Sequence, residues 1–171
     1  PENIMFVNKN STNIKIIDFG VSKYFFCPEN PKKVITLRTQ AGSLYYISPE
    51  TIEGVYDCGC DIWSAGVILY SLFAGVPPFY DNDPNIVVSK VRNIDYDFKE
   101  EVWQKVSPEV IDLIKHMLTK REKRFSADDV LQHPWMKMNL DKKTFVIDLN
   151  SLKRFYMGSS ISKVFLEIIT A

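Results

Sequence analysis

The sequence is poor in the residue types that build disulfide and metal frameworks. Its 171 residues include three cysteines and two histidines. An odd number of cysteines with so few histidines supports neither a disulfide scaffold nor a Cys/His metal site. Cys58-Gly59-Cys60 has no second thiol pair to complete a tetrahedral zinc site, so we expect ordinary thiols there. This cysteine usage favours a reducing compartment.

Net charge and long apolar runs are also lacking. The 21 Lys and Arg residues balance 21 Asp and Glu residues, which argues against nucleic acid as the main partner. The most apolar run, residues 67–74, is far shorter than the roughly 18 residues of a membrane-spanning helix, so no transmembrane segment is expected. The chain begins at Pro1 without an initiator Met or a targeting pattern, and we interpret it as a piece of a longer parent protein. A cytoplasmic location is expected, with membrane anchoring of the parent left open.

The composition that is present is typical of a packed domain. Hydrophobic residues make up 46% and charged residues 25%, which excludes collagen-like and fully disordered chains. The length allows one domain, or one domain with an appendage.

The pattern of apolar residues predicts a mainly α fold with a small β-hairpin. Residues 4–7 and 14–17 read as short strands joined by a polar turn, and residues 21–49 lack a sustained period and are expected to form a functional loop. Residues 61–74 are apolar almost all round, which predicts a central buried helix ended by Gly75. Three further helices are expected to begin at capping residues, namely Asp83, Ser107 and Ser126.

The chain divides into a compact part and a tail. We expect residues 1–138 to form one domain, with His133-Pro134-Trp135 packing its last helix. Residues 139–171 read as a polar linker followed by an amphipathic segment. Its two apolar stripes are Leu149, Leu152, Phe155 and Tyr156, then Phe165, Ile168 and Ile169.

The residues with the clearest chemistry lie near the first hairpin. Asp18-Phe19-Gly20 follows the second strand, and Asn3 precedes the first, so a carboxylate and an amide oxygen can converge on a hard cation such as Mg²⁺. Taken alone, the tripeptide fits a strand ending in an Asp-stabilised turn equally well. Other motifs follow in a fixed order: Ser48-Pro49-Glu50, Asp61-Ile62-Trp63, Arg124 and His133-Pro134-Trp135.

This order and spacing resembles the large, C-terminal lobe of the eukaryotic protein kinases over residues 1–138. Residues 45–50, 56–64 and 66–79, with the tail from Leu149, are most similar to the calcium-dependent protein kinases of plants and protists, in the calmodulin-dependent kinase group. The resemblance implies a kinase-like C-lobe without the small N-terminal lobe. It further implies a parent that transfers the ATP γ-phosphoryl group to Ser or Thr of protein substrates.

The resemblance also implies roles at the nucleotide. Asn3 and Asp18 match the ligands of the Mg²⁺ ions that bridge the ATP phosphates, with Asp18 counted as catalytic. Met5 and Ile17 match the apolar floor under the adenine. Ser43, also counted as catalytic, stands where the family usually has a Thr whose hydroxyl contacts the catalytic base.

At the protein substrate, Leu44 and Ile47 match the wall of the pocket for the residue after the phosphoacceptor. Glu2 is the candidate for contacting a basic substrate residue. Thr39 aligns with a loop position that is often phosphorylated, where added charge orders the segment.

Three residues are implied to support the site. Glu50 and Arg124 match a buried ion pair, and losing one partner of such a pair typically costs about 3–5 kcal/mol. Asp61 matches a buried carboxylate that accepts backbone N–H bonds from the catalytic loop. Burying a carboxylate without such partners costs free energy, which favours this hydrogen-bonded role.

Several parts of a working calcium-dependent kinase are not found in this sequence. The catalytic base, the ATP-binding Lys and the small lobe have no match, so the fragment itself is expected to be inactive. No EF-hand pattern occurs, so Ca²⁺ is expected to act only through EF-hands outside the chain, in cis or in a calmodulin-like protein, with the tail as the autoinhibitory junction. The alternative is a pseudokinase-like binding or scaffolding module. Retention of both Asn3 and Asp18 favours the enzyme.

Overall fold

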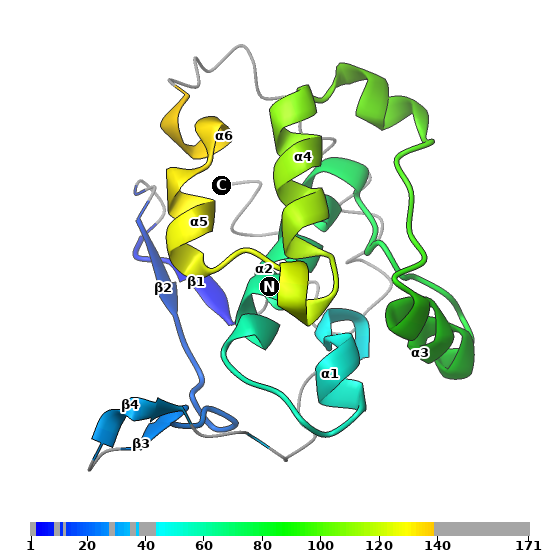
Figure 1. Ribbon diagram of the computed structural model, residues 1–171. Coiled ribbons are helices and arrows are strands. Elements are labelled where there is room, and N and C mark those ends of the chain that lie inside the picture. Colours follow the sequence, from blue (N-terminus) through cyan, green and yellow to red (C-terminus); the bar gives the residue numbers. More distant parts are fainter. Residues whose placement is uncertain are drawn as a thin grey trace.

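The computed structural model describes residues 3–8, 11, 13–27, 30–34, 37 and 44–138 (Figure 1). The strands are β1 (Ile4–Phe6), β2 (Ile14–Ile16), β3 (Phe26–Cys27) and β4 (Asn30–Val34). The helical elements are η1 (Leu44–Tyr46), α1 (Pro49–Ile52), α2 (Gly59–Ala74), α3 (Pro84–Asn93), η2 (Glu101–Lys105), α4 (Pro108–Met117), η3 (Arg121–Lys123), α5 (Ala127–Gln132) and α6 (Pro134–Lys137). The predicted class, mainly α with a small hairpin, is confirmed.

The strands form two separate antiparallel hairpins. β1 pairs with β2 so that Ile4 lies opposite Ile16, and each strand is one residue shorter than predicted. Residues 21–49, expected to form a functional loop, also contain regular structure, because β3 pairs with β4 there and Leu37 bridges to Tyr56. The second hairpin was missed because β3 has only two residues and β4 includes the polar run Asn30-Pro31-Lys32-Lys33, which shows no period-2 alternation.

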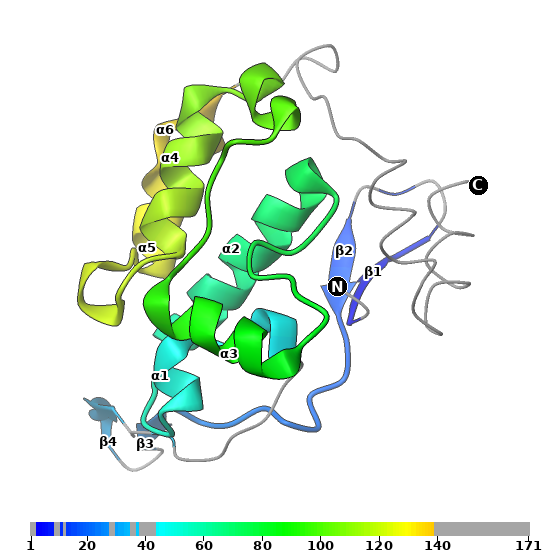
Figure 2. The same cartoon turned by 90° about the vertical axis from the view of Figure 1, so that its right-hand side faces the viewer.

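Helix α2 lies at the centre of the helical part. Figure 2 shows it between the β1–β2 hairpin on one side and α4, α5 and α6 on the other. The predicted central helix is confirmed, and it begins at Gly59, slightly earlier than expected. Gly75 ends it with a left-handed φ of 78°, and its N–H donates to the Ser71 carbonyl at 2.8 Å.

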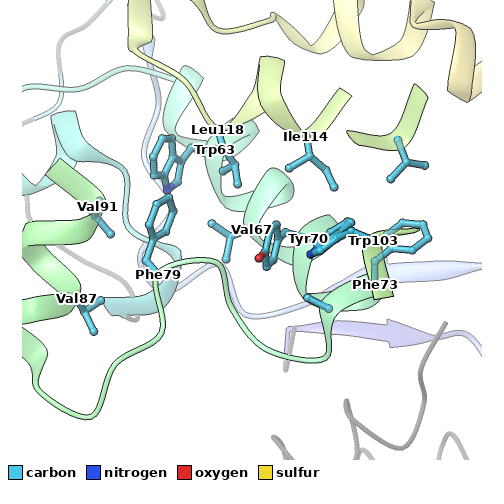
Figure 3. Packing of buried hydrophobic residues seen from close by; sticks show 12 residues of the cluster. Trp63, Val67, Tyr70, Phe73, Phe79, Val87, Val91, Trp103, Ile114 and Leu118 are labelled. Carbon is cyan, nitrogen blue, oxygen red and sulfur yellow. The ribbon is translucent and has the colours of Figure 1, made fainter. Parts of the chain in front are cut away.

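The core gathers around α2 (Figure 3). Trp63 stacks on Phe79 with ring centroids 5.3 Å apart and an angle of 5° between the ring planes. The ring centroids of Tyr70 and Trp103 are 4.7 Å apart. Helix α4 contributes its buried face, Val110, Leu113, Ile114 and Met117. This core joins α2, α3, α4 and the loops between them.

Two of the predicted helix caps form hydrogen bonds. Asp83 Oδ1 accepts the N–H of Asn85 at 2.8 Å, and α3 runs to Asn93. Ser126 and Asp129 form a capping box at α5. Ser107 precedes α4 as predicted, but its hydroxyl makes no cap bond.

His133 has the structural role expected of it. The residue is 7% exposed, and its Nε2 lies 3.1 Å from Asp112 Oδ2 on α4. Its Nδ1 accepts the N–H of Trp135 at 3.3 Å, which places the ring proton on Nε2 as a donor to Asp112. His133 therefore ties the junction of α5 and α6 to α4.

Candidate active site

The β1–β2 ladder brings the two expected metal ligands to the same end of the hairpin. Ile17 N–H donates to the Asn3 carbonyl at 2.8 Å, which extends the strand pairing beyond Ile4 and Ile16. Asn3 therefore lies opposite Ile17, the residue that precedes Asp18. Backbone hydrogen bonds of the ladder thus hold Asn3 beside Ile17.

Asp18 occupies an unusual backbone conformation. Its φ is 61°, in the left-handed region that non-glycine residues seldom adopt. Asp18 Oδ1 accepts the N–H of Gly20 at 3.0 Å, which stabilises the turn. Strained conformations of this kind cluster at functional sites. The turn is of the Asp-stabilised type that the tripeptide alone predicts, so by itself it does not identify a metal site.

The oxygens at this end of the hairpin suit a hard cation. Both Asn3 and Asp18 are exposed. Among the residues that the structure describes, neither the Asn3 side chain nor Asp18 Oδ2 makes a hydrogen bond. Mg²⁺ prefers such oxygens and keeps several positions for water and phosphate, so the donor set fits this ion.

The strand register groups Met5 and Ile17 with Asn3. Side chains alternate between the faces of a strand, so Met5 shares a face with Asn3, and Ile17 lies on that face opposite Asn3. Met5 is half-buried and Ile17 is 39% exposed. The two residues predicted to lie under the adenine are therefore on one accessible face of the hairpin.

A cavity of about 480 Å³ separates the segment after Asp18 from the start of α2. Phe19, Phe25, Ile47, Cys60 and Asp61 are among the residues that line it. The structure thus brings three of the sequence motifs around one cavity. Leu44, which was also predicted to contact the substrate, is partly buried against the core cluster.

The expected burial of Asp61 is wrong, because the residue is exposed. The N–H donors that the resemblance assigns to it belong to a catalytic loop with no match in this sequence. Neighbouring side chains still desolvate the carboxylate partly, which raises its pKa, while a long contact from the Cys60 thiol at 3.8 Å opposes the rise.

Glu50 and Arg124 form a bidentate ion pair. Arg124 Nη2 donates to Glu50 Oε2 at 3.0 Å and Nη1 donates to Oε1, with side-chain exposures of 2% for Arg124 and 8% for Glu50. Burial alone would raise the pKa of Glu50, but the hydrogen bonds from Arg124, from the backbone and from Ser48, together with the charge of Arg124, outweigh it, and the pKa is lowered. Arg124 also donates to the carbonyls of Gly59 and Thr119 and lies over the Trp63 ring. The pair therefore joins α1 to α2 and to the α4–α5 loop.

Two polar contacts near the site had no counterpart in the sequence-based predictions. Ser64 Oγ lies 2.8 Å from the carbonyl oxygen of Tyr46, and Arg121 Nε donates to Asp57 Oδ2 at 2.9 Å. Neither pair has a sequence spacing that signals contact. A Ser directly after Asp61-Ile62-Trp63 was the only hint for the first.

Other predicted residues lie outside the described part of the chain. These are Glu2, Thr39, Ser43 and the tail 139–171. Within the described residues there is no group of three His, Cys, Asp or Glu side chains arranged to hold a metal, and no helix has the length and apolar character needed to cross a bilayer. Cys58 and Cys60 are free, and burial raises the pKa of Cys60 to about 12.

Comparison with known proteins identifies the family. Residues 1–136 match the protein kinase domain, so the chain belongs to the protein kinase family. A solved structure described as titin kinase and its flanking domains superimposes with a TM-score of 0.80 at 29% identity, covering 94% of this chain and 29% of that chain.

The similar curated proteins are calcium-dependent protein kinases. Calcium-dependent protein kinase 3 of Plasmodium yoelii yoelii is 38% identical over 99% of this chain, and calcium-dependent protein kinase 22 of Arabidopsis thaliana is 41% identical over 99%. Calcium-dependent protein kinase 4 of Plasmodium falciparum is 43% identical over 90%. The chain spans 32%, 35% and 28% of their respective lengths, about a third of each relative.

Proposed function

We propose that this chain is the helical lobe of a serine/threonine protein kinase that transfers the γ-phosphoryl group of Mg-ATP to protein substrates. The observation that carries the proposal is the pairing of Asn3 with Ile17, which sets an amide oxygen and the Asp18 carboxylate at one end of the β1–β2 hairpin. Family membership supports the reaction class. The longer protein that supplies the remaining lobe is called the parent kinase below.

In this proposal the residues of the chain position the reactants. Asn3 and Asp18 would hold Mg²⁺, and the turn bond from Gly20 N–H to Asp18 Oδ1 fixes one carboxylate oxygen and leaves the other for the ion. When bound, Mg-ATP would supply the transferable phosphoryl group, and its Mg²⁺ would offset the negative charge on the phosphates. Met5 and Ile17 would contact the adenine, while Leu44 and Ile47 would contact the protein substrate. The Glu50–Arg124 pair holds the segment that carries these substrate residues.

We further propose that the parent kinase is regulated by calcium through EF-hands outside this chain. The names of the similar proteins support this, together with the basic and apolar pattern that begins at Leu149. The general base belongs to a segment without a match here, so the 171-residue chain alone should not transfer phosphate.

One assay tests these points together. The parent kinase and the 171-residue chain are each incubated with Mg-ATP and paired peptides that differ only in a Ser, Thr or Tyr acceptor, with Ca²⁺ or with a chelator. We expect Ca²⁺-dependent phosphorylation of the Ser and Thr peptides by the parent kinase and none by the chain. Phosphate transfer by the chain alone would refute the placement of the base, and a parent kinase inactive under all conditions would favour a scaffolding module.

A further inference from the structure

The segment around η1, which the proposed function assigns to the protein substrate, packs against the core between α2 and α3. Leu44 and Ile47, the two residues assigned to the substrate pocket, flank the Tyr46 carbonyl. η1 is a single 3-10 turn, and a segment with so little regular hydrogen bonding depends on individual anchors for its conformation.

One anchor comes from the central helix. Ser64 on α2 has its Oγ 2.8 Å from the Tyr46 carbonyl oxygen and 3.1 Å from the Cys60 carbonyl oxygen in its own helix. A hydroxyl has one proton to donate, and the shorter distance favours Tyr46 as the acceptor. Helical serines commonly donate back to the carbonyl four residues earlier, so a donation out of the helix is notable.

Another serine of the same helix provides a comparison. Ser71 Oγ lies 2.7 Å from the Val67 carbonyl, the ordinary bond within a helix, and Ser71 is 2% exposed. Ser64 and Ser71 therefore share a residue type and a helix. They differ in that only Ser64 reaches the substrate segment.

A second anchor holds the other side of η1. The Tyr45 ring stacks on Tyr80 with centroids 5.7 Å apart, and the Tyr45 hydroxyl lies 3.5 Å from the Asp81 carbonyl. Lys90 of α3 holds this loop by donating to both the Tyr80 carbonyl and the Asp81 carboxylate at 3.0 Å. The Tyr45 contacts thus hold one residue of η1, and the contact with Ser64 holds the carbonyl of the next residue, in the peptide unit that joins Tyr46 to Ile47.

We propose that Ser64 is a positioning residue for the protein substrate. Its hydrogen bond sets the orientation of the Tyr46–Ile47 peptide unit and so the placement of Ile47 at the cavity relative to Leu44. The inference rests on the proposed function, because it needs Leu44 and Ile47 to contact substrate. It predicts an effect on peptide binding and none on nucleotide binding.

The test uses Ser64→Ala, Ser64→Thr and the matched control Ser71→Ala in the parent kinase. Loss of one hydrogen bond of ordinary strength should raise the peptide KM about three- to tenfold in Ser64→Ala. The KM for ATP and kcat should stay unchanged. Ser64→Thr, which keeps the hydroxyl, should restore the peptide KM, and Ser71→Ala should leave it at the wild-type value.

Hydrogen exchange of the amides of residues 44–48 separates this inference from the proposed function. Ser64→Ala should speed their exchange about three- to tenfold while Ser71→Ala does not. If wild-type protein phosphorylates nothing, the proposed function fails and the exchange result still decides whether Ser64 positions the segment. Unchanged exchange and unchanged peptide KM in Ser64→Ala, or equal effects in Ser71→Ala, would overturn the inference.

Discussion

The helical part of the chain buries its large apolar side chains, whereas the β1–β2 hairpin leaves several of them exposed. Trp63 and Phe79 in the helical part are 0% exposed, whereas Ile16 and Phe19 in and after the hairpin are 65% and 68% exposed. The helical part encloses its own core, and the described residues leave the hairpin largely uncovered. Stability is therefore concentrated in one region, and the proposed metal site lies in the other.

Among the variants that test this comparison, Arg124→Ala is expected to lower the free energy of unfolding the most. The substitution leaves the Glu50 carboxylate buried without its partner, which should lower the free energy of unfolding by about 3–5 kcal/mol. Urea unfolding of the 171-residue chain measures this loss. Arg121→Ala is the control, because its pair with Asp57 is more exposed and should contribute about 1 kcal/mol or less. Equal losses in the two variants would show that the buried pair contributes no more to stability than the exposed pair.

Alkaline pH should weaken the helical core next. Burial raises the pKa of Tyr70 to about 12, with the Glu100 charge adding to the shift, and burial also raises the pKa of Tyr96. Because the folded pKa lies above the ordinary value of about 10, this contribution to stability is full below pH 10 and is lost as pH rises through 12. Tyr70 alone should account for about 2 kcal/mol by pH 12.

Unfolding curves measured at rising pH, followed together with phenolate absorbance, test this titration. In Tyr70→Phe the decline in stability above pH 10 should be shallower than in the wild-type chain. An identical decline in both would contradict the role of Tyr70.

Gly66→Ala tests the close approach of α2 and α4. A Cβ at Gly66 would lie 2.8 Å from Met117 Cβ and 3.0 Å from Leu118 Cδ2, inside a packed core. Overpacking should outweigh the better helix propensity of Ala and lower the free energy of unfolding by about 1–2 kcal/mol. Thermal and urea unfolding both report this change. A more stable Gly66→Ala variant would mean that the helices can separate without cost.

The smallest effect is expected from Ile16→Ser in the hairpin. The side chain is already 65% exposed, so the free energy of unfolding of the 171-residue chain should change by about 0.5 kcal/mol or less. Ile114→Ser, at a position that is 0% exposed, should cost several times more, on the order of 2–5 kcal/mol. Comparable losses at both positions would remove the distinction between the two regions.

The sequence predicted those elements whose signals are local. Asp83 and Ser126 mark helix starts because their side chains bond the first-turn N–H groups, and residues 61–74 are apolar on all sides because α2 is central. Helix α1 escaped prediction because four residues make only about one helical turn, and the β3–β4 hairpin escaped because β4 is mostly polar and does not alternate.

The site was predicted from motif order, and its contacts depend on tertiary structure. The Glu50–Arg124 pair could be named because the resemblance supplied it, although its partners are 74 residues apart. The burial of Asp61 could not be judged from the chain, since it depends on groups that this sequence does not contain. The contact from Ser64 to Tyr46 could not be predicted, because the place of Ser64 directly after Asp61-Ile62-Trp63 does not specify which carbonyl its hydroxyl contacts.

The most direct test of the central claim is the rate of phosphoryl transfer by the parent kinase carrying Asp18→Ala, measured beside its thermal unfolding. If Asp18 holds the metal in a region that adds little to stability, transfer to a Ser or Thr peptide should fall by roughly 10²–10³-fold or more, with the unfolding transition unchanged. Retained transfer would remove Asp18 from the metal site. A lost unfolding transition would show instead that the hairpin and the helical core depend on each other for folding.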